Sequence, residues 1–335
     1  MFKVYKNHYR RQPFTHHPAL GWWGLPNVDM RLALGQTYHR FITNGRGLRE
    51  AAEFTPQIPV GKKRIMFLGD SYTAGDGVDN DARFSNRIAQ MCPTIETMNL
   101  GLNNSGTDQQ VLAFEEFGAG YDADAYVFGI CPENISRNLA TCRPSWDYME
   151  AGAIYRPKPY FTLANGALQL HQSPVPNTYK KEEDVQVAGW VAFSPHMKPY
   201  ENNIYSAYRN TADMPWQLMQ AILCRFLDRV AGKPVFLVGL PMVSHYMHHV
   251  ADDHTAALQA LAATYSNVFV VNPLAAMVQV PLQDRMQTLS FPADPHYTPA
   301  AHAIVADVLL QSISSYAPQL VTAPAARTGT MGEAA

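Results

Sequence analysis

The sequence has few charged residues and almost no net charge, which limits what the protein can bind. Charged residues make up 16% of its 335 positions, and the formal net charge is −2. A nearly neutral chain provides no field that would attract nucleic acid or an anionic membrane surface. We therefore expect neither nucleic acid nor a membrane as a partner, and the sequence gives no indication of an oligomeric state.

Long apolar runs are also missing. No segment approaches the roughly 18 uninterrupted apolar residues of a transmembrane helix. The opening stretch, MFKVYKNHYRRQPF, is basic but is not followed by the apolar core of a signal peptide. Cysteine is scarce, and no two cysteines form a Cys-x-x-Cys pair. This pattern favours buried free thiols in a reducing compartment. From these features we expect a cytoplasmic protein with four unpaired cysteines: Cys92, Cys131, Cys142 and Cys224.

Motifs for metals and nucleotides are absent too. The stretch HYMHHVADDH, residues 245–254, is rich in histidine but lacks His-Glu-x-x-His, and Asp252 is well placed to cap a following helix. The stretch GLNNSGTDQQ, residues 101–110, has neither Gly-x-Gly-x-x-Gly nor a Gly-Lys-Ser ending. We expect no metal and no cofactor. The histidine cluster could still line the substrate-binding site, and this alternative stays open.

What the sequence does contain is a regular alternation of strand and helix patterns. The apolar runs are continuous, which is typical of strands covered on both faces, and helical patterns follow them. This alternation predicts a three-layer α/β/α sandwich around a five-stranded parallel sheet. The predicted strands lie at 64–69, 95–101, 125–130, 234–240 and 267–273, and the predicted helices at 82–91, 107–118, 216–231, 253–264 and 299–315.

Three regions fall outside this alternation. Residues 1–60 are aromatic and turn-rich, and we expect an N-terminal arm packed on the core by Trp22 and Trp23. Residues 140–215 form a long insertion within a main domain at 61–316, with a hairpin that turns at Asn165-Gly166. An insertion of this length is typical of a lid, a specificity element or a contact surface. Residues 317–335 are predicted to be a flexible tail.

Residues suited to acyl transfer follow the predicted strands. Ligands bind at the carboxyl ends of strands in such sheets. Ser71 follows the first strand, Gly101 the second and Asn134 the third, while Asp294 and His296 precede the last helix. A serine hydroxyl needs an imidazole to take its proton, and a carboxylate orients that imidazole. The N–H groups of Ser71 and Gly101 and the amide of Asn134 could stabilise the oxyanion.

These blocks resemble those of the SGNH/GDSL hydrolase superfamily. The similar stretches are GDSYTAGDGV, NLG, the asparagine after the third strand and the terminal Asp-x-His. The resemblance implies a flavodoxin-like sheet, with Ser71 as the nucleophile and His296 as the base paired with Asp294. It also implies that Gly101 and Asn134 complete the oxyanion hole.

The sequence departs from the superfamily pattern in two places. The third block usually reads Gly-x-Asn-Asp, but here it is GICPENIS, with no aspartate after Asn134, so Asn138 is an alternative donor. The last block often has two residues between Asp and His, whereas DPH has one. Three other residues receive structural interpretations: Asp70 braces the turn, His302 packs in the final helix, and Arg83 is a surface or ion-pairing residue near the site.

The sequence therefore predicts a serine esterase that acts on small O-acyl esters, with acetyl groups on carbohydrate as the preferred class. An O-acyltransferase with the same residues and a hydroxyl acceptor is the first alternative. A binding module that has kept the fold and lost turnover is the second.

Overall fold

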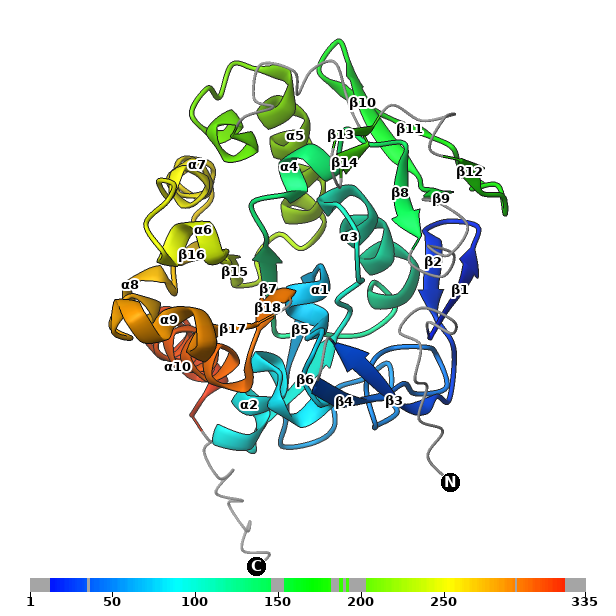
Figure 1. Ribbon diagram of the computed structural model, residues 1–335. Helices are drawn as coiled ribbons and strands as arrows, with labels where there is room; N and C mark the ends of the chain where they lie inside the picture. The colour runs from blue at the N-terminus through cyan, green and yellow to red at the C-terminus, as the bar shows by residue number, and fades with distance from the viewer. Residues whose placement is uncertain are drawn as a thin grey trace, which may run out of the picture.

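A parallel sheet of five strands forms the centre of the molecule (Figure 1). The computed structural model describes residues 13–34, 37–145, 154–181, 187–188, 191–192, 203–292 and 294–322. The sheet strands are β5 (Lys63–Gly69), β6 (Ile95–Asn99), β7 (Ala125–Ile130), β15 (Val235–Gly239) and β16 (Val268–Val271). Their order across the sheet is β16-β15-β7-β5-β6. All five predicted strands are confirmed, and so is the flavodoxin-like order.

The continuous apolar runs are explained by cores on both faces of the sheet. Met66 and Leu68 of β5 point into one core, whereas Ile65 and Phe67 point into the other. All four side chains are fully buried. A strand that alternates between two dry faces needs apolar residues at every position, which is why no polar alternation is visible in the sequence.

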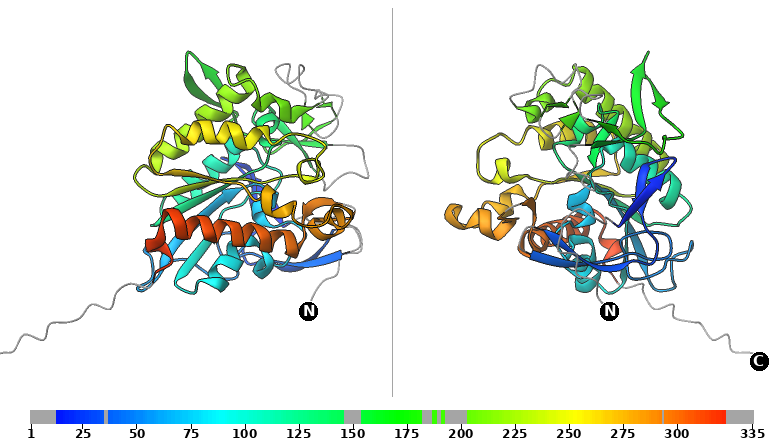
Figure 2. Two further views of the ribbon diagram at one scale, coloured as in Figure 1. Left: turned by 90° about the vertical axis from the view of Figure 1, so that its left-hand side faces the viewer. Right: turned by 45° about the vertical axis from the view of Figure 1, so that its right-hand side comes forward.

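Helices cover both faces, as the side view in Figure 2 shows. The core on one face includes residues of α3 (Thr107–Ala113), α5 (Met214–Arg229) and α7 (Asp253–Ala262). The core on the other face includes residues of α2 (Phe84–Met91), α8 (Leu274–Met277), α9 (Leu282–Leu289) and α10 (Pro299–Tyr316). The predicted three-layer sandwich is confirmed. The helix predicted at 107–118 consists of α3 and a π-helical segment, Phe114–Gly118.

Two antiparallel hairpins precede the sheet in the chain. The first joins β1 (Phe14–His17) to β2 (Gly21–Gly24), and the second joins β3 (Asp29–Leu34) to β4 (Thr37–Ile42). The Trp23 ring stacks on Phe117 with 4.2 Å between ring centroids. The Trp22 Nε1 donates to the Asn103 carbonyl at 2.9 Å. Both tryptophans therefore attach this region to the body of the molecule, as the sequence indicates.

Residues 49 and 50 tie the N-terminal region to the loop that follows β5. The Arg49 guanidinium donates to the Ala74 carbonyl at 2.7 Å, and the Phe41 ring lies 4.6 Å from it. Glu50 pairs with Arg83 at 2.9 Å. Arg83 is fully buried, so of its two predicted roles the ion pair is confirmed and the surface position is wrong. The predicted domain boundary at residue 60 therefore divides residues that contact each other: Arg49 and Glu50 lie before it, and the loop that they hold lies after it.

The inserted region contains short strands and one buried ion pair. Strands β12 (Lys180–Lys181), β9 (Ile154–Pro157) and β8 (Cys142–Ser145) form one sheet, and β13 (Val187–Ala188) pairs with β14 (Val191–Ala192). The predicted hairpin is confirmed as β10 (Tyr160–Ala164) and β11 (Ala167–His171), with positive φ at Asn165 and Gly166. Lys158 forms a fully buried ion pair with Asp108 at the start of α3, which attaches the insertion to the core.

The end of the described chain differs from the prediction of a flexible tail. Residues 318–320 form a 3-10 turn, Pro318–Leu320, and the side chains of Ala317 and Leu320 are buried against the face that α10 covers. Two apolar side chains within reach of the core are enough to hold this turn in place. Residues 323–335 of the predicted tail lie outside the described residues. In the part of the chain that the structure describes, no helix has both the length and the apolar character to cross a bilayer.

The buried Trp23 provides a stability test for the N-terminal region. We expect Trp23→Ala to lower the free energy of unfolding by about 3 to 5 kcal/mol, because it removes a large side chain from a packed core. Urea unfolding followed by circular dichroism would measure this. Tyr38→Ala, at a site that is 45% exposed, is the matched control and should cost less than about 1 kcal/mol. Equal losses for the two variants would show that the first hairpin contributes no specific packing.

Candidate functional site

Ser71 lies at the point where the strand order of the sheet reverses. Its strand, β5, has β6 on one side and β7 on the other. Such a switch point leaves a crevice beyond the carboxyl ends of the strands. Ser71 begins the short helix α1 (Ser71–Ala74), and the Asp70 carboxylate caps this helix by accepting from the Tyr72 N–H at 3.0 Å. Asp70 thus braces the turn, as expected.

The tight turn depends on Gly69. Its φ is +153°, and a Cβ at this position would lie 2.1 Å from Thr73 Oγ1. Any larger residue would collide with the first turn of α1, so glycine allows the strand to pass directly into the helix. The serine is thereby held at the edge of the sheet, where it is 5% exposed.

His296 and Asp294 meet Ser71 from the opposite end of the sequence. They lie on β18 (Asp294–Tyr297), which pairs with β17 (Ser290–Phe291) and is adjacent to α1 (Figure 1). The His296 Nε2 is 2.7 Å from the Ser71 Oγ. The His296 Nδ1 is hydrogen-bonded to the Asp294 carboxylate, which also accepts from the His296 backbone N–H at 2.9 Å. The structure thus brings the three predicted catalytic residues into one hydrogen-bonded row.

Tyr72 helps to hold this row in place. Its hydroxyl donates to the Pro295 carbonyl at 3.1 Å, and its ring centroid lies 4.9 Å from that of His296. The residue after the serine therefore contacts the turn that carries the histidine. This contact couples the two ends of the site.

The charges around His296 favour its protonated form. Burial lowers the pKa of His296, but the hydrogen bond and charge of Asp294, followed by the charges of Asp76 and Asp70, outweigh burial and raise that pKa to about 8. For Asp294, burial raises the pKa, but the hydrogen bond and charge of His296 prevail and lower it. The carboxylate thus stabilises the protonated ring, and the neutral imidazole is a somewhat stronger base than that of an ordinary histidine.

Gly101 differs from its predicted role. Its N–H donates to the Asn99 side-chain oxygen at 2.8 Å, so this donor is already engaged. A Cβ at position 101 would lie 2.4 Å from the Ala74 nitrogen. The glycine is thus explained by close packing against α1. The expectation that its N–H is a free oxyanion donor is wrong for this arrangement, because the asparagine two residues earlier supplies an internal acceptor.

The side-chain amide of Asn134, unlike the Gly101 N–H, is a donor without a partner among the described residues. The residue begins α4 (Asn134–Arg137) and is fully buried, and the donor in question is its Nδ2. The Asn134 Oδ1 accepts from Arg137 at 3.4 Å. The backbone N–H of Ser71 also has no acceptor in the described part of the chain. Buried donors without partners are costly, so these two N–H groups are candidates to donate to a bound substrate oxygen.

Two other expected side chains have structural partners. The Asn138 Oδ1 accepts from the Asp108 backbone N–H at 3.2 Å, but the Asn138 Nδ2 is buried without a partner among the described residues, so Asn138 stays an alternative donor. The His302 Nδ1 accepts from the Phe84 N–H at 3.3 Å inside the core, which confirms a packing role.

Several side chains of the histidine-rich stretch at 245–254 also have partners within the protein. Asp252 caps α7, as predicted, and its carboxylate lies 2.7 Å from His254. The His248 ring is 2.9 Å from the Arg285 guanidinium. Across the described residues, no three His, Cys, Asp or Glu side chains are grouped as metal ligands.

Two residues near the row, His39 and Asp76, were missed from the sequence. His39 on β4 is buried with its Nδ1 unpartnered among the described residues; burial, then Arg49 and His296, lower its pKa to about 3. Asp76 accepts a hydrogen bond from the Asn103 amide. The position of Asp76 between two glycines in the loop after the first strand could have indicated a residue near the site. The sequence does not show where the hairpin that carries His39 packs, so His39 could not be found in this way.

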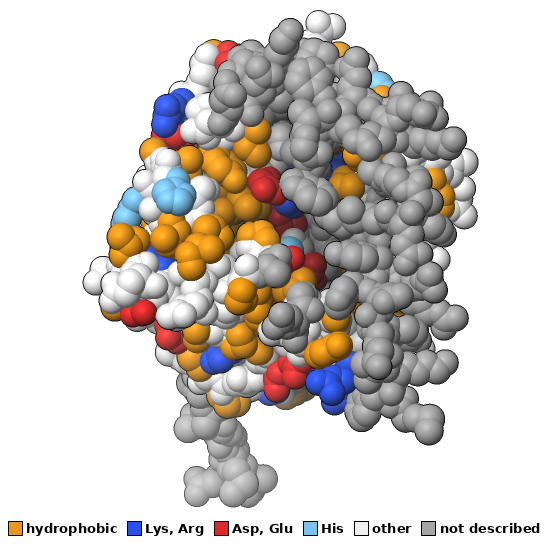
Figure 3. Space-filling view, viewed as in Figure 1, with side chains coloured by type: hydrophobic (Ala, Val, Ile, Leu, Met, Phe, Trp, Pro, Cys, Tyr) orange, Lys and Arg blue, Asp and Glu red, His pale blue; other side chains and the backbone are white. Residues whose placement is uncertain are grey.

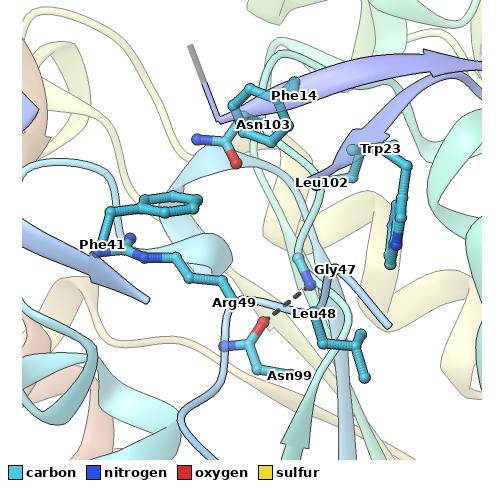
Figure 4. A pocket seen from close by; sticks show the side chains of 11 residues that line it. Phe14, Trp23, Phe41, Gly47, Leu48, Arg49, Asn99, Leu102 and Asn103 are labelled. Carbon is cyan, nitrogen blue, oxygen red and sulfur yellow. Dashed lines mark hydrogen bonds between the residues drawn. The ribbon is translucent and has the colours of Figure 1, made fainter. Parts of the chain in front are cut away.

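A small pocket borders the loop that follows β6, where Gly101, Leu102 and Asn103 line it. It encloses about 260 Å³ of space, some of it open to solvent. In Figure 4 the Phe14, Trp23 and Phe41 rings surround it, with Arg49 beside Phe41. Figure 3 shows acidic and histidine side chains gathered in a hollow near the centre of the face seen in Figure 1.

Comparison with known proteins adds distant structural similarities. No protein-family model matches the sequence, and no curated protein matches it. Similar solved structures include a member of the lipolytic G-D-S-L family from Veillonella parvula, with 11% identity and a TM-score of 0.43 over 75% of this chain and 98% of that one. A lipase/acylhydrolase from Enterococcus faecalis has 12% identity and a TM-score of 0.43 over 76% of this chain and 96% of that one.

A third similar structure is a two-domain esterase active on acetylated mannans. It is 12% identical, with a TM-score of 0.41, over 81% of this chain and 53% of that one. Similarities this distant do not establish what the present chain does, so the functional argument rests on the geometry of the site.

The raised pKa of His296 predicts the pH dependence of any reaction that uses it as a base. A base must be unprotonated, so kcat/KM for an activated acetyl ester should rise with pH and level off above about 8. Asp294→Asn removes the interaction that raises the pKa, so the rise should move to lower pH while the plateau falls about 10⁴-fold. Initial rates from about pH 6 to pH 9 would measure both effects. A flat profile in this range would contradict the assignment.

Proposed function

We propose that this protein is a serine hydrolase of the SGNH/GDSL type, which cleaves O-acyl esters through an acyl-enzyme on Ser71. One observation carries the proposal: the hydrogen-bonded row from Ser71 Oγ through the His296 ring to the Asp294 carboxylate. The sequence blocks that resemble the superfamily support it. The parallel sheet with Ser71 at its switch point supports it as well.

In the first half of the proposed reaction, Ser71 attacks the ester carbonyl. Its Oγ forms a bond to the carbonyl carbon while its proton passes to His296 Nε2, and the π electrons move onto the carbonyl oxygen. The Ser71 N–H and the Asn134 Nδ2 donate to this oxyanion. The intermediate collapses as the C–O bond to the alcohol breaks, and the His296 proton goes to the departing alkoxide. Ser71 is left as an ester.

In the second half, water takes the place of the alcohol. His296 accepts a proton from the water as it attacks the acyl carbon, and the same donors stabilise the second oxyanion. Collapse breaks the bond to Ser71 Oγ, which recovers a proton from His296, and the acid is released. Asp294 remains ionised throughout and stabilises the imidazolium.

The proposed substrates are small O-acyl esters, with acetyl esters of carbohydrate as the preferred class. This preference comes from the sequence resemblance, and the similar structures include a two-domain esterase active on acetylated mannans. We further propose that the chain forms one hydrolase domain with its N-terminal region packed on it. A cytoplasmic location is supported by four cysteines that form no disulfide.

Ser71→Ala tests the proposed nucleophile. The variant should lose ester turnover by several orders of magnitude, since no other described group at the end of β5 could form the acyl-enzyme. Its melting temperature should stay close to that of the parent, because removing one hydroxyl oxygen leaves the surrounding apolar packing unchanged. Ser314→Ala, on the exposed face of α10, is the matched control and should keep full activity. Turnover of p-nitrophenyl acetate and labelling by a fluorophosphonate probe are the measurements.

A binding module or an unrelated enzyme would behave differently. Full activity in Ser71→Ala, or a wild-type protein that is neither active nor labelled by the probe, would contradict the proposal.

The acceptor of the acyl group needs a separate test. With an activated acetyl ester and an oligosaccharide present together, a hydrolase releases acetate and leaves the oligosaccharide unchanged. We expect this result because water can enter the second half-reaction in the same way as an alcohol. Mass spectrometry of the oligosaccharide, with Ser71→Ala as the blank, would measure transfer. An acetylated oligosaccharide formed faster than acetate would instead identify an acyltransferase.

A further inference from the structure

A buried arginine connects the loops of the site. Arg137 is the last residue of α4, and only 7% of it is exposed. Its NH1 donates to the Asp70 carboxylate at 2.8 Å and to the Ser105 carbonyl at 3.3 Å. Its NH2 pairs with the Glu133 carboxylate. These partners follow β5, β6 and β7, three adjacent strands of the sheet, so one side chain links all the loops at the switch point.

The same guanidinium determines which way the Asn134 amide faces. An arginine can only donate, so the amide must present its oxygen to Arg137, and the Asn134 Oδ1 does accept from NH1 at 3.4 Å. The Nδ2 end is then directed away from Arg137, and it is the end that is buried without a partner among the described residues. A reversed amide would place two donors face to face.

Arg137 also acts on the turn that carries Ser71. The Asp70 carboxylate accepts from the Tyr72 N–H on one oxygen and from Arg137 on the other. Burial raises the pKa of Asp70, and the charge of Arg137 opposes that rise. The capping carboxylate and the Asn134 amide therefore share one rigid, planar partner.

We propose that Arg137 is the positioning residue of the oxyanion hole: its guanidinium holds the Asn134 amide with Nδ2 toward the reacting carbonyl, in register with the Ser71 turn. The inference rests on the proposed function, since it needs an oxyanion to form at Ser71. It assigns Arg137 no contact with substrate. It also explains how Asn134 is oriented in a block that has no aspartate after the asparagine.

Arg137→Lys tests the proposal because it retains the charge but loses the planar fork. We expect kcat for p-nitrophenyl acetate to fall about a hundredfold, with KM changed by less than about threefold, because the oxyanion exists only in the transition state. Arg285→Lys is the matched control: Arg285 is as buried as Arg137, but it donates to the carbonyls of Tyr246, Val278 and Val280, none of which lies in a loop after β5, β6 or β7. It should keep kcat within about threefold of the parent.

A double-mutant cycle separates positioning from general stability. Asn134→Ala alone should lower kcat about 10² to 10³-fold, as loss of an oxyanion donor does. In the Asn134→Ala background, Arg137→Lys should cost less than about threefold more, since the amide that it positions is gone. Losses that multiply, or a normal kcat in Arg137→Lys, would overturn the inference. If Arg137→Lys does not fold, Arg137→Gln, whose amide can still donate to Asp70, enters the same cycle.

The two levels of the argument fail in different ways. Full turnover in Ser71→Ala would overturn the proposed function and this inference together. An inactive Ser71→Ala beside a fully active Arg137→Lys would overturn the role of Arg137 alone.

Discussion

The hydrogen bond between Ser71 and His296 is the contact on which the rest of the site depends. It joins residues 225 positions apart, one at the end of the first sheet strand and the other just before the last helix. Neither segment could hold the other by itself, because α1 has four residues and β18 has four. Their meeting requires the whole sheet between them, with its two cores, to fix the distance. The catalytic row is therefore a property of the complete fold.

Several buried charges elsewhere in the fold form ion pairs. Arg83 pairs with Glu50, Arg137 with Asp70 and Glu133, and Lys158 with Asp108. Removing one partner from such a pair typically costs about 3 to 5 kcal/mol, whereas the intact pair adds little to stability. These ion pairs fix the orientation of the segments that they join, because an ion pair with defined hydrogen bonds permits fewer arrangements than an apolar contact. The loops that carry Ser71 and Asn134 are held by such pairs.

The sheet and most of the site could be predicted because their signals are local. A strand covered on both faces needs a continuous apolar run, and strand ends in a parallel sheet converge, so Ser71, Asn134 and His296 could be placed together from their positions alone. Gly101 shows the limit of this reasoning. Its place at a strand end was correct, but the acceptor of its N–H is the Asn99 side chain. That choice depends on a loop conformation that no spacing rule contains.

Other features were beyond the sequence for related reasons. Arg49, Glu50 and Arg137 are charged residues in loops or short helices, and composition assigns such residues to the surface unless their partners are known. Four-residue helices such as α1 and α4 are too short to show a helical period. At residues 317–322 the composition resembles a free tail, yet two apolar side chains attach it to the core.

The order of these parts along the chain has a consequence for biosynthesis. The ribosome makes Arg49, Glu50 and the Ser71 turn early, but it adds His296 only after most of the sheet has been translated. A nascent or prematurely terminated polypeptide that stops before residue 296 carries the nucleophile without its proton acceptor. On the proposed mechanism, incomplete translation products are inert, and ester cleavage begins only when the polypeptide has extended past its final sheet strand.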